Sequence, residues 1–386
     1  MIDGYDLARD LAAINRALAG DMPEAAIFYC GRALEVTSAR AISSLNLDPG
    51  MQVFANLEML ERLSCITRPA LYLGHALRRL ANDARHILRP LSRHDADFAA
   101  LCLGPWLEWY MRDYFLGPQA AVTDNSFGVR SPLATGAVAE ALRLLNRADE
   151  EDVSDRVLAL RKDEIVAIPA LAAMVAEVLI SDGRAGDAQI VLQLALAQVP
   201  QDLRLNQLYA LGLRRAGRGD EALALLQSLS GKYQEDEETL GITAGALKSN
   251  WEHGRGPVDA LGRAAKLYAK GFQISRERNL YLGVNCAALE LWQGDARAKE
   301  HAAHVVELFG ARNARLSASG IDVAARRDYY DLVTEAEALL LSGQGASARD
   351  LYRRAFVRFA ARKGDIEGTV AQANRSIALL GGEAIS

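Results

Sequence analysis

The sequence has little of what several classes of protein require. Its 386 residues contain only 10 prolines, and its four cysteines (Cys30, Cys65, Cys102 and Cys286) stand far apart with no CxxC pair. Cysteines in this pattern predict reduced core residues in a cytosolic protein rather than a disulfide framework. Runs in which Val, Ile or Thr alternate strictly with polar residues are missing, so strands are not expected.

Long apolar segments and an excess of basic charge are missing too. The longest apolar stretch, 165–180, is interrupted by Pro169 and Glu177 and is too short to span a membrane. The first residues are acidic and lack the apolar core of a secretory signal. A net charge of -5 argues against a globally basic nucleic-acid binder, although a local basic stripe stays compatible with it. We therefore expect a cytoplasmic protein that does not bind membranes.

Motifs for cofactors, metals and common enzymatic chemistry are also missing. The sequence contains no Walker loop, GxGxxG, GxSxG or HExxH. His301 and His304 lie three residues apart on an expected helix, but no third ligand stands near them in the sequence. We therefore expect solvated surface histidines, no metal and no cofactor.

What the sequence does contain is helical periodicity almost throughout. Hydrophobic residues make up 50% of the chain, and Ala and Leu, both strong helix formers, dominate them. We expect Asp21 to cap the second helix, with Pro23 inside its first turn, and Pro90 to end the fourth. The helices expected in the N-terminal part are 5–19, 22–43, 51–66, 70–89, 95–115 and 134–147.

The best candidate for a domain boundary is the segment 117–132, which is rich in Gly, Pro, Ser and Asp. We accordingly predict a helical bundle over 1–116, a linker over 117–132 and a second helical domain over 133–386.

A repeat begins near residue 168. SDGRAGDA (181–188) recurs as RAGRGDEA (215–222), so that Gly183 and Gly217, like Ala188 and Ala222, are 34 residues apart, which is the tetratricopeptide period. Each Gly is expected to end the first helix of a hairpin, and each Ala to let its two helices approach closely. The turn reappears as WQGDARA (292–298) and SGQGASA (342–348) at longer spacing. The fold class predicted is all-α, with a tetratricopeptide-like right-handed superhelix after the N-terminal bundle.

Four ordered segments of the C-terminal half resemble one family. They are DEETLGITAGALK (236–248), LYAKGF (267–272), YLGVNCAALELWQGD (281–295) and YYDLVTEAEALLLSG (329–343). Together they resemble the TRAF-binding, tetratricopeptide-like (TPR-S) region of the apoptosis signal-regulating kinases and its bacterial relatives, over about 165–383. The resemblance implies a sensor or scaffold unit, in bacteria as part of defence or stress systems. No kinase domain is present, so kinase activity is not implied.

A ligand groove is expected on the first helix of each hairpin, which lines the concave face of such a superhelix. The polar candidates for a peptide or a small polar ligand are Lys270, Tyr281, Asn285, Thr334 and Glu337. Lys270 is expected at a turn beside Gly271, and Thr334 and Glu337, three residues apart, share a helix face. The alternative is that Asn285 and Glu337 cap neighbouring turns or pair with arginines such as Arg353.

The fourth expected helix carries an unusual concentration of basic side chains. Between Arg68 and His94 there are six arginines and three histidines, against one acid, Asp83. LRRLANDARH (77–86), together with RALE (32–35), resembles the Arg…Asn…His signature of HEPN-like helical domains over about 5–115. Some members of that superfamily are metal-independent ribonucleases, and in that case Arg79 and His86 would be the catalytic pair.

Three interpretations of this helix stay open. The one we favour is a structural polar cluster of Glu35, Arg78, Arg79, Asn82 and His86, in which Glu35 pairs with Arg78 or Arg79. The others are phosphate or nucleotide binding and RNA cleavage.

For the whole chain we expect a non-enzymatic adaptor or sensor. Its superhelix would bind a peptide, a partner protein or a nucleotide-like signal, and its N-terminal bundle would dimerise or engage an effector. The alternative is a HEPN-type ribonuclease, regulated by the superhelix, with RNA as its substrate.

Overall fold

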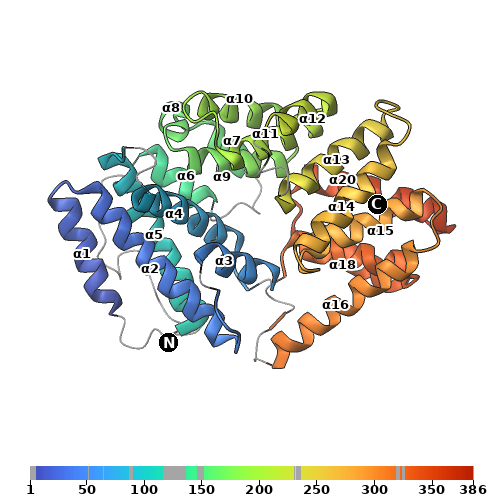
Figure 1. Ribbon diagram of the computed structural model, residues 1–386, viewed down its shortest axis with the longest axis horizontal. Helices are drawn as coiled ribbons and strands as arrows, with labels where there is room; N and C mark the ends of the chain where they lie inside the picture. The colour runs from blue at the N-terminus through green and yellow to red at the C-terminus, as the bar shows by residue number, and fades with distance from the viewer. Residues whose placement is uncertain are drawn as a thin grey trace. The chain divides into compact units, whose positions relative to one another are not determined.

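Every regular element of the computed structural model is a helix within the part of the chain that it describes (Figure 1), which confirms the all-α prediction. The described residues are 6–50, 52–63, 65–86, 90–115, 136–145, 152–229, 231, 236–318, 322–323 and 327–385; the side chains of Arg62, Arg68, His86 and Phe115 are not among them. The chain forms two compact units. The first comprises residues 1–146 with 316–326, and the second comprises 147–315 with 327–386.

The first unit is a bundle packed around one long helix, α2 (Pro23–Ser44). The indole nitrogen of Trp106, on α5 (Arg93–Tyr110), donates to the hydroxyl of Thr37, on α2, at 2.8 Å and connects the two helices in the core. Gly31 of α2 lies so close to α4 that a Cβ there would stand 2.4 Å from the Cβ of Ala81. The helices of this unit are α1 (Leu7–Ala19), α2 (Pro23–Ser44), α3 (Val53–Arg62), α4 (Arg68–His86), α5 (Arg93–Tyr110) with a π-helical end (Met111–Phe115), and α6 (Ala137–Leu145).

The start of α2 differs from the sequence prediction. Met22 precedes the helix, and no side chain caps it. Asp21 instead adopts a positive φ of 50° inside the turn that ends α1, where the Met22 amide donates to the Ala17 carbonyl at 2.9 Å. The prediction that Asp21 caps α2 was therefore wrong, because the closing turn of the preceding helix determines its conformation.

The predicted linker, 117–132, lies outside the described residues, so the proposed boundary stays a prediction. Within the described ranges, no helix is both long and apolar enough to cross a membrane. All four cysteines are buried, as expected for core residues, and none of them forms a disulfide.

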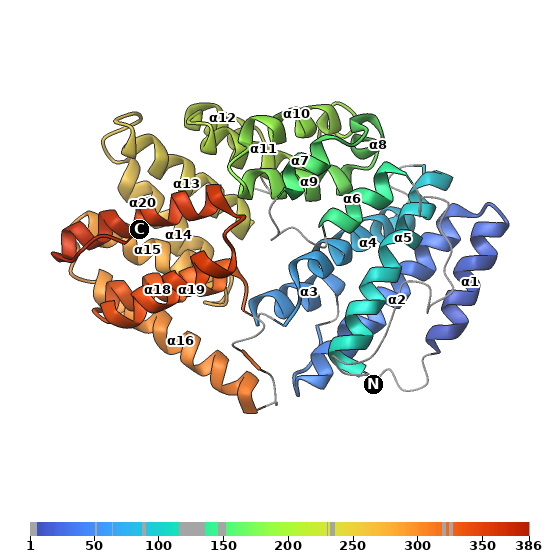
Figure 2. The same cartoon turned by 180° about the vertical axis from the view of Figure 1, so that it is seen from behind.

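The second unit is a series of helical hairpins that follows two short helices and precedes one long final helix (Figure 2). The short helices are α7 (Val153–Leu158) and α8 (Lys162–Val166). The hairpins are α9/α10 (Pro169–Ser181, Ala185–Leu196), α11/α12 (Leu203–Arg215, Gly219–Ser228), α13/α14 (Glu237–Glu252, Ala260–Ile274), α15/α16 (Leu280–Trp292, Ala298–Ala318) and α18/α19 (Tyr329–Ser342, Gly345–Arg358). The final helix is α20 (Lys363–Leu380).

One turn geometry closes the first helix of each hairpin. A glycine with φ between 66° and 98° follows that helix, at Gly183, Gly217, Gly254, Gly294 and Gly343. In the first of these turns, the Gly183 amide donates to Ile180 at 3.1 Å and the Arg184 amide donates to Leu179 at 2.8 Å, and the same pair of bonds recurs in the other four. This Schellman arrangement favours glycine because only glycine adopts the left-handed conformation without strain.

The sequence predicted four of these turns, and the structure confirms that a glycine closes the first helix in each. It missed the one at Gly254, where the loop is longer: Gly256 also has a positive φ, and the next helix begins only at Ala260. The spacing from glycine to buried alanine, by which the other turns were found, is therefore altered there.

Candidate binding surface on the inner helices

The first helices of the five hairpins present one surface to the final helix. We call α9, α11, α13, α15 and α18 the inner helices, because hydrogen bonds join each of them, or the residue that ends it, to α20 or to the Arg362 that precedes α20. Four side chains of α20 that make such contacts stand at helical spacing: Asp365, Thr369, Gln372 and Ser376. We call them the polar stripe of α20. A helix thus lies on the inner surface and is held there by polar side chains.

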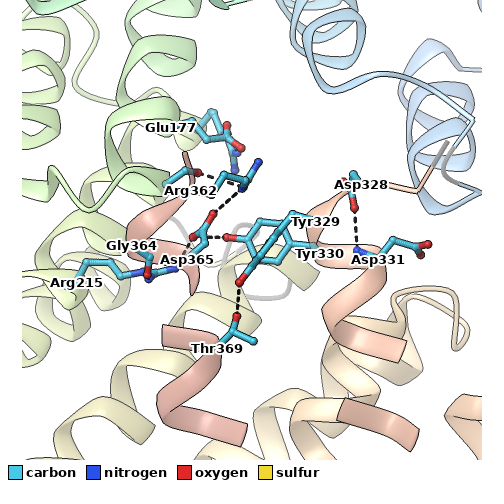
Figure 3. A network of polar contacts seen from close by, with 12 residues as sticks. Glu177, Arg215, Asp328, Tyr329, Tyr330, Asp331, Arg362, Gly364, Asp365 and Thr369 are labelled. Atoms are coloured by element: carbon cyan, nitrogen blue, oxygen red, sulfur yellow. Dashed lines mark hydrogen bonds and ion pairs between the residues drawn. The ribbon is translucent and has the colours of Figure 1, made fainter. Parts of the chain in front are cut away.

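Asp365 anchors the first turn of α20. This carboxylate is 2% exposed, and it accepts hydrogen bonds from Arg362 at 2.7 Å, from Arg215 of α11 at 2.7 Å and from the Tyr330 hydroxyl of α18 at 2.7 Å (Figure 3). Arg215 also donates to the backbone carbonyl of Gly364. Two guanidinium groups therefore neutralise one buried carboxylate, and each of them gains a fixed partner.

Arg362, which pairs with Asp365, also contacts two aromatic rings of α18. The Arg362 guanidinium lies 5.2 Å from the ring centre of Tyr329 and 5.1 Å from that of Tyr330. The Tyr329 hydroxyl and the Thr369 hydroxyl are hydrogen bonded at 2.7 Å. Aromatic rings and a desolvated guanidinium attract one another, so α18 contributes both polar and cation–π contacts to α20.

Gln372 is the centre of the polar stripe. Its amide nitrogen donates to both oxygens of Glu337, at 2.7 and 2.8 Å, and to the Asn285 side-chain oxygen at 3.2 Å. Its amide oxygen accepts from the Lys248 ammonium. A single side chain of α20 therefore satisfies groups from α13, α15 and α18.

Burial shifts the titration of the two ionisable groups around Gln372 in opposite directions. Desolvation raises the pKa of Glu337 to about 7, against the hydrogen bonds from Gln372 and the charge of Lys248, which lower it. Desolvation lowers the pKa of Lys248 to about 8, and the charge of Glu252 offsets part of this. In both cases burial disfavours the charged form.

We expect a stability minimum between pH 7 and pH 8. The pKa of Glu337 is raised, so the contribution of this group to the free energy of unfolding is fully present below the usual pKa of 4.5 and is lost as the pH rises to about 7. The pKa of Lys248 is lowered, so its contribution to the free energy of unfolding is present above the usual pKa of 10.5 and is lost as the pH falls to about 8.

The variant Glu337→Gln tests the first of these effects. The loss of about 3 kcal/mol in the free energy of unfolding between pH 4.5 and pH 7 should disappear in this variant. Urea unfolding of both proteins at intervals from pH 4.5 to pH 8 measures it, and equal slopes would contradict the assignment.

The last contacts of α20 involve two tryptophans. The Trp292 indole nitrogen donates to the Ser376 hydroxyl at 3.0 Å. Trp251 and Trp292 stack with ring centres 6.1 Å apart, and the Arg375 guanidinium lies 5.1 Å from each ring centre. The ends of α13 and α15 thus form an aromatic platform for an α20 cation.

The structure brings some of the predicted groove residues together. Asn285 and Glu337 both contact Gln372, and Thr334 is buried on α18 with Glu337. Tyr281 is 40% exposed and packs edge-to-face against Tyr268 and Tyr330. The alternative partner considered for Glu337, Arg353, pairs with Asp350 instead.

Lys270 differs from the prediction. It was expected at a turn, but Gly271 lies inside α14, the second helix of its hairpin, which runs to Ile274. The reason for the glycine is packing, since a Cβ at Gly271 would stand 2.8 Å from a methyl carbon of Leu282. Lys270 is exposed on that outer helix.

Sequence reasoning missed the residues that hold α20 most firmly. Arg215, Lys248, Asp365 and Gln372 were not among the candidates, because nothing in the sequence places the final helix against the first helices. The available signal was the spacing of Asp365, Thr369, Gln372 and Ser376, which puts polar groups on one face of a helix.

A second candidate site lies in the first unit. A cavity of about 260 Å³ is lined by Arg78, Asn82 and Arg85 of α4, Glu35 of α2 and Phe54 of α3, among others. Burial lowers the pKa of Arg78 to about 10, its Nε atom is buried without a hydrogen-bond partner, and its guanidinium lies 5.1 Å from the Phe54 ring centre.

The ion pair at this cavity differs from the predicted one. Glu35 accepts from Arg85 at 2.7 Å rather than from Arg78 or Arg79. The helical repeat explains the difference in part, because Arg78, Asn82 and Arg85 stand on one face of α4, whereas Arg79 is turned about 100° from Arg78. The side chain of His86, the remaining member of the predicted cluster, lies outside the described residues.

Comparison with protein families shows that part of the second unit is similar to tetratricopeptide-like proteins. The model of the Tetratricopeptide Repeats-Sensor family (TPR-S) matches residues 187–290, a segment from α10 to α15. The chain therefore contains a tetratricopeptide-like region, as the sequence predicted; its extension to 165 and 383 stays a prediction.

Other comparisons are more distant. Among solved structures, the chain is similar to one described as a Rap protein complexed with Competence and Sporulation Factor, with 11% identity, coverage of 97% of this chain and 98% of that chain, and a TM-score of 0.40. No curated protein sequence matches the chain.

Proposed function

We propose that the chain is a helical adaptor or sensor whose inner surface recognises a helix of a partner protein in exchange for α20. The observation that carries this proposal is the polar stripe of α20. Side chains at positions i, i+4, i+7 and i+11 of this one helix contact four of the five inner helices, α11, α13, α15 and α18. The fifth, α9, is bonded through Ser181 to Arg362, just before α20. The partner would present acceptor and donor groups at the same spacing.

A polar interface of this kind suits exchange. A hydrogen bond contributes only about 0.5–1.5 kcal/mol net, but a buried group left without a partner costs about 1–3 kcal/mol. An empty inner surface is therefore unfavourable, because it leaves Lys248, Glu337 and Asn285 without hydrogen-bond partners. Any helix that supplies those partners can take the place of α20. The match of residues 187–290 to a sensor family is consistent with this role.

The cavity of the first unit favours a second candidate function, the binding of an anionic or nucleotide-like small molecule. The supporting observation is Arg78, whose buried Nε atom has no hydrogen-bond partner. A HEPN-like identity, RNA cleavage by Arg79 and His86, dimerisation and a role in bacterial defence stay predictions.

The test is to turn α20 into a separate peptide after folding. A protease site inserted between Ala360 and Ala361, in the connection from α19 to α20, lets the folded chain be cut there. A fluorescent peptide of residues 361–385 is then added, and its incorporation is followed by anisotropy. We expect the labelled peptide to replace the cut segment while the circular dichroism spectrum stays helical.

Peptide variants establish which contacts are recognised. A Gln372→Ala peptide should compete about tenfold less well, which corresponds to about 1.4 kcal/mol. Glu367→Ala is the matched control, because Glu367 is exposed on the same helix, and that peptide should compete like the wild type. If the cut segment cannot be replaced without unfolding the chain, α20 is a permanent part of the core and the proposal fails.

A further inference from the structure

Three potential metal ligands meet at the fourth hairpin, and none of their side chains takes part in the contacts of α20 described above. Cys286 and Glu290 stand four residues apart on α15, so their side chains share a face, and His301 stands in the first turns of α16. The thiol donates to one Glu290 oxygen at 3.8 Å, and the His301 Nδ1 atom lies 2.6 Å from the other. The three ligand atoms all lie within 4.8 Å of one another.

The set has the composition of a zinc site. Thiolate, imidazole and carboxylate are the three side-chain ligands that Zn²⁺ takes in proteins, whereas Mg²⁺ and Ca²⁺ prefer oxygen alone. The sequence led us to expect no metal at His301 because no third ligand stands near it; the hairpin supplies the other two by folding α15 against α16. We propose that Cys286, Glu290 and His301 bind one Zn²⁺ ion.

The burial pattern fits three protein ligands and one open position. Cys286 and Glu290 are each 7% exposed, whereas the His301 side chain is 45% exposed. Zn²⁺ requires ligand distances of about 2.0–2.3 Å, so the three atoms must move closer together, and this requires a rotation of the half-exposed imidazole. The fourth position then faces solvent and takes a water molecule. On binding, the Cys286 thiol loses its proton to solvent and the sulfur bonds to the metal.

The neighbouring histidine provides a matched control. His304 stands one turn further along α16, has 44% side-chain exposure and pairs with Glu277 at 3.0 Å. It has the same residue type, helix and exposure as His301, but it is not one of the three converging ligands.

The experiment uses the full-length chain, stripped of metal with a chelator and titrated with Co²⁺, Cd²⁺ and Zn²⁺. We expect one Cd²⁺ per chain with a thiolate-to-metal charge-transfer absorption, a tetrahedral Co²⁺ spectrum, and displacement of Co²⁺ by Zn²⁺. Cys286→Ser should abolish the charge-transfer band. His301→Ala and Glu290→Gln should weaken binding by more than about tenfold, and His304→Ala should leave it unchanged.

Several outcomes would overturn the proposal. The absence of a charge-transfer band in the wild type shows that the three groups form only a hydrogen-bonded chain. A band that persists in Cys286→Ser places the metal on another thiol. Equal losses in His301→Ala and His304→Ala indicate non-specific binding by surface histidines. Circular dichroism checks that each variant is folded. Glu290→Gln retains the size of the side chain and tests the site independently of the two other substitutions.

Discussion

Asp365→Ala is expected to lower the free energy of unfolding of the second unit by about 3–5 kcal/mol. Asp365 is 2% exposed, and its carboxylate pairs with two guanidinium groups, those of Arg362, itself 5% exposed, and Arg215. Its removal leaves two guanidinium groups in a desolvated position and takes away the acceptor of the Tyr330 hydroxyl. The loss of a buried charge partner costs far more than the loss of an exposed one, because the remaining charges cannot be rehydrated.

Asp350→Ala is the control for this prediction. Asp350 also pairs with an arginine, Arg353, but the two side chains are 49% and 75% exposed. Its replacement should cost less than about 1 kcal/mol. Urea denaturation followed by circular dichroism compares the two variants, and similar losses would show that the Asp365 cluster is hydrated in solution.

Gly364→Ala is expected to cost about 1–3 kcal/mol and to loosen the start of α20. A Cβ at Gly364 would stand 2.5 Å from both the Cα and the backbone nitrogen of Gly183, and 3.1 Å from the Ile180 carbonyl oxygen. These atoms belong to the backbone of the last turn of α9 and of the turn that follows it, so no side chain can move aside. Thermal unfolding and faster amide hydrogen exchange in α20 measure the effect.

Gly310→Ala is expected to stabilise the protein, in contrast to Gly364→Ala. Gly310 lies inside α16, is exposed and has nothing within 4 Å of the position of a Cβ. Alanine there should stabilise the protein by about 0.5–1 kcal/mol, because it restricts the unfolded chain and favours the helix. A destabilisation of equal size in both variants would indicate a general effect of the substitution rather than the contact between Gly364 and Gly183.

The hairpins could be predicted from the sequence because their determinants are local. Amphipathic spacing specifies a helix over one or two turns, and a glycine in the left-handed conformation ends it without help from distant residues. Four of the five turns were found in this way. Gly254 was missed because its longer loop shifts the next helix, and Asp21 was misassigned because a cap and a closing turn use the same residue types.

The candidate site could be predicted only in part. Asn285 and Glu337 were identified because polar residues on the first helices of hairpins stand out against an apolar pattern. Lys270 was placed wrongly, because a glycine inside a helix and a glycine at a turn look alike in sequence. The pairing of Glu35 with Arg85 was missed because several arginines follow one another on α4, and only the rotation of the helix selects one.

By itself, the sequence determined the helical class, four of the five hairpin turns and the tetratricopeptide-like character of the region 187–290, since each depends on interactions within a few residues. The tertiary structure alone decided what covers the inner surface and which groups converge at the fourth hairpin. Arg215 and Asp365 are 150 residues apart in the chain, and Lys248 and Gln372 are 124 apart. Contacts of that range depend on how successive hairpins stack, which is set by the packing of whole helices. The sequence shows that one face of α20 is polar, but it does not show which helices that face contacts.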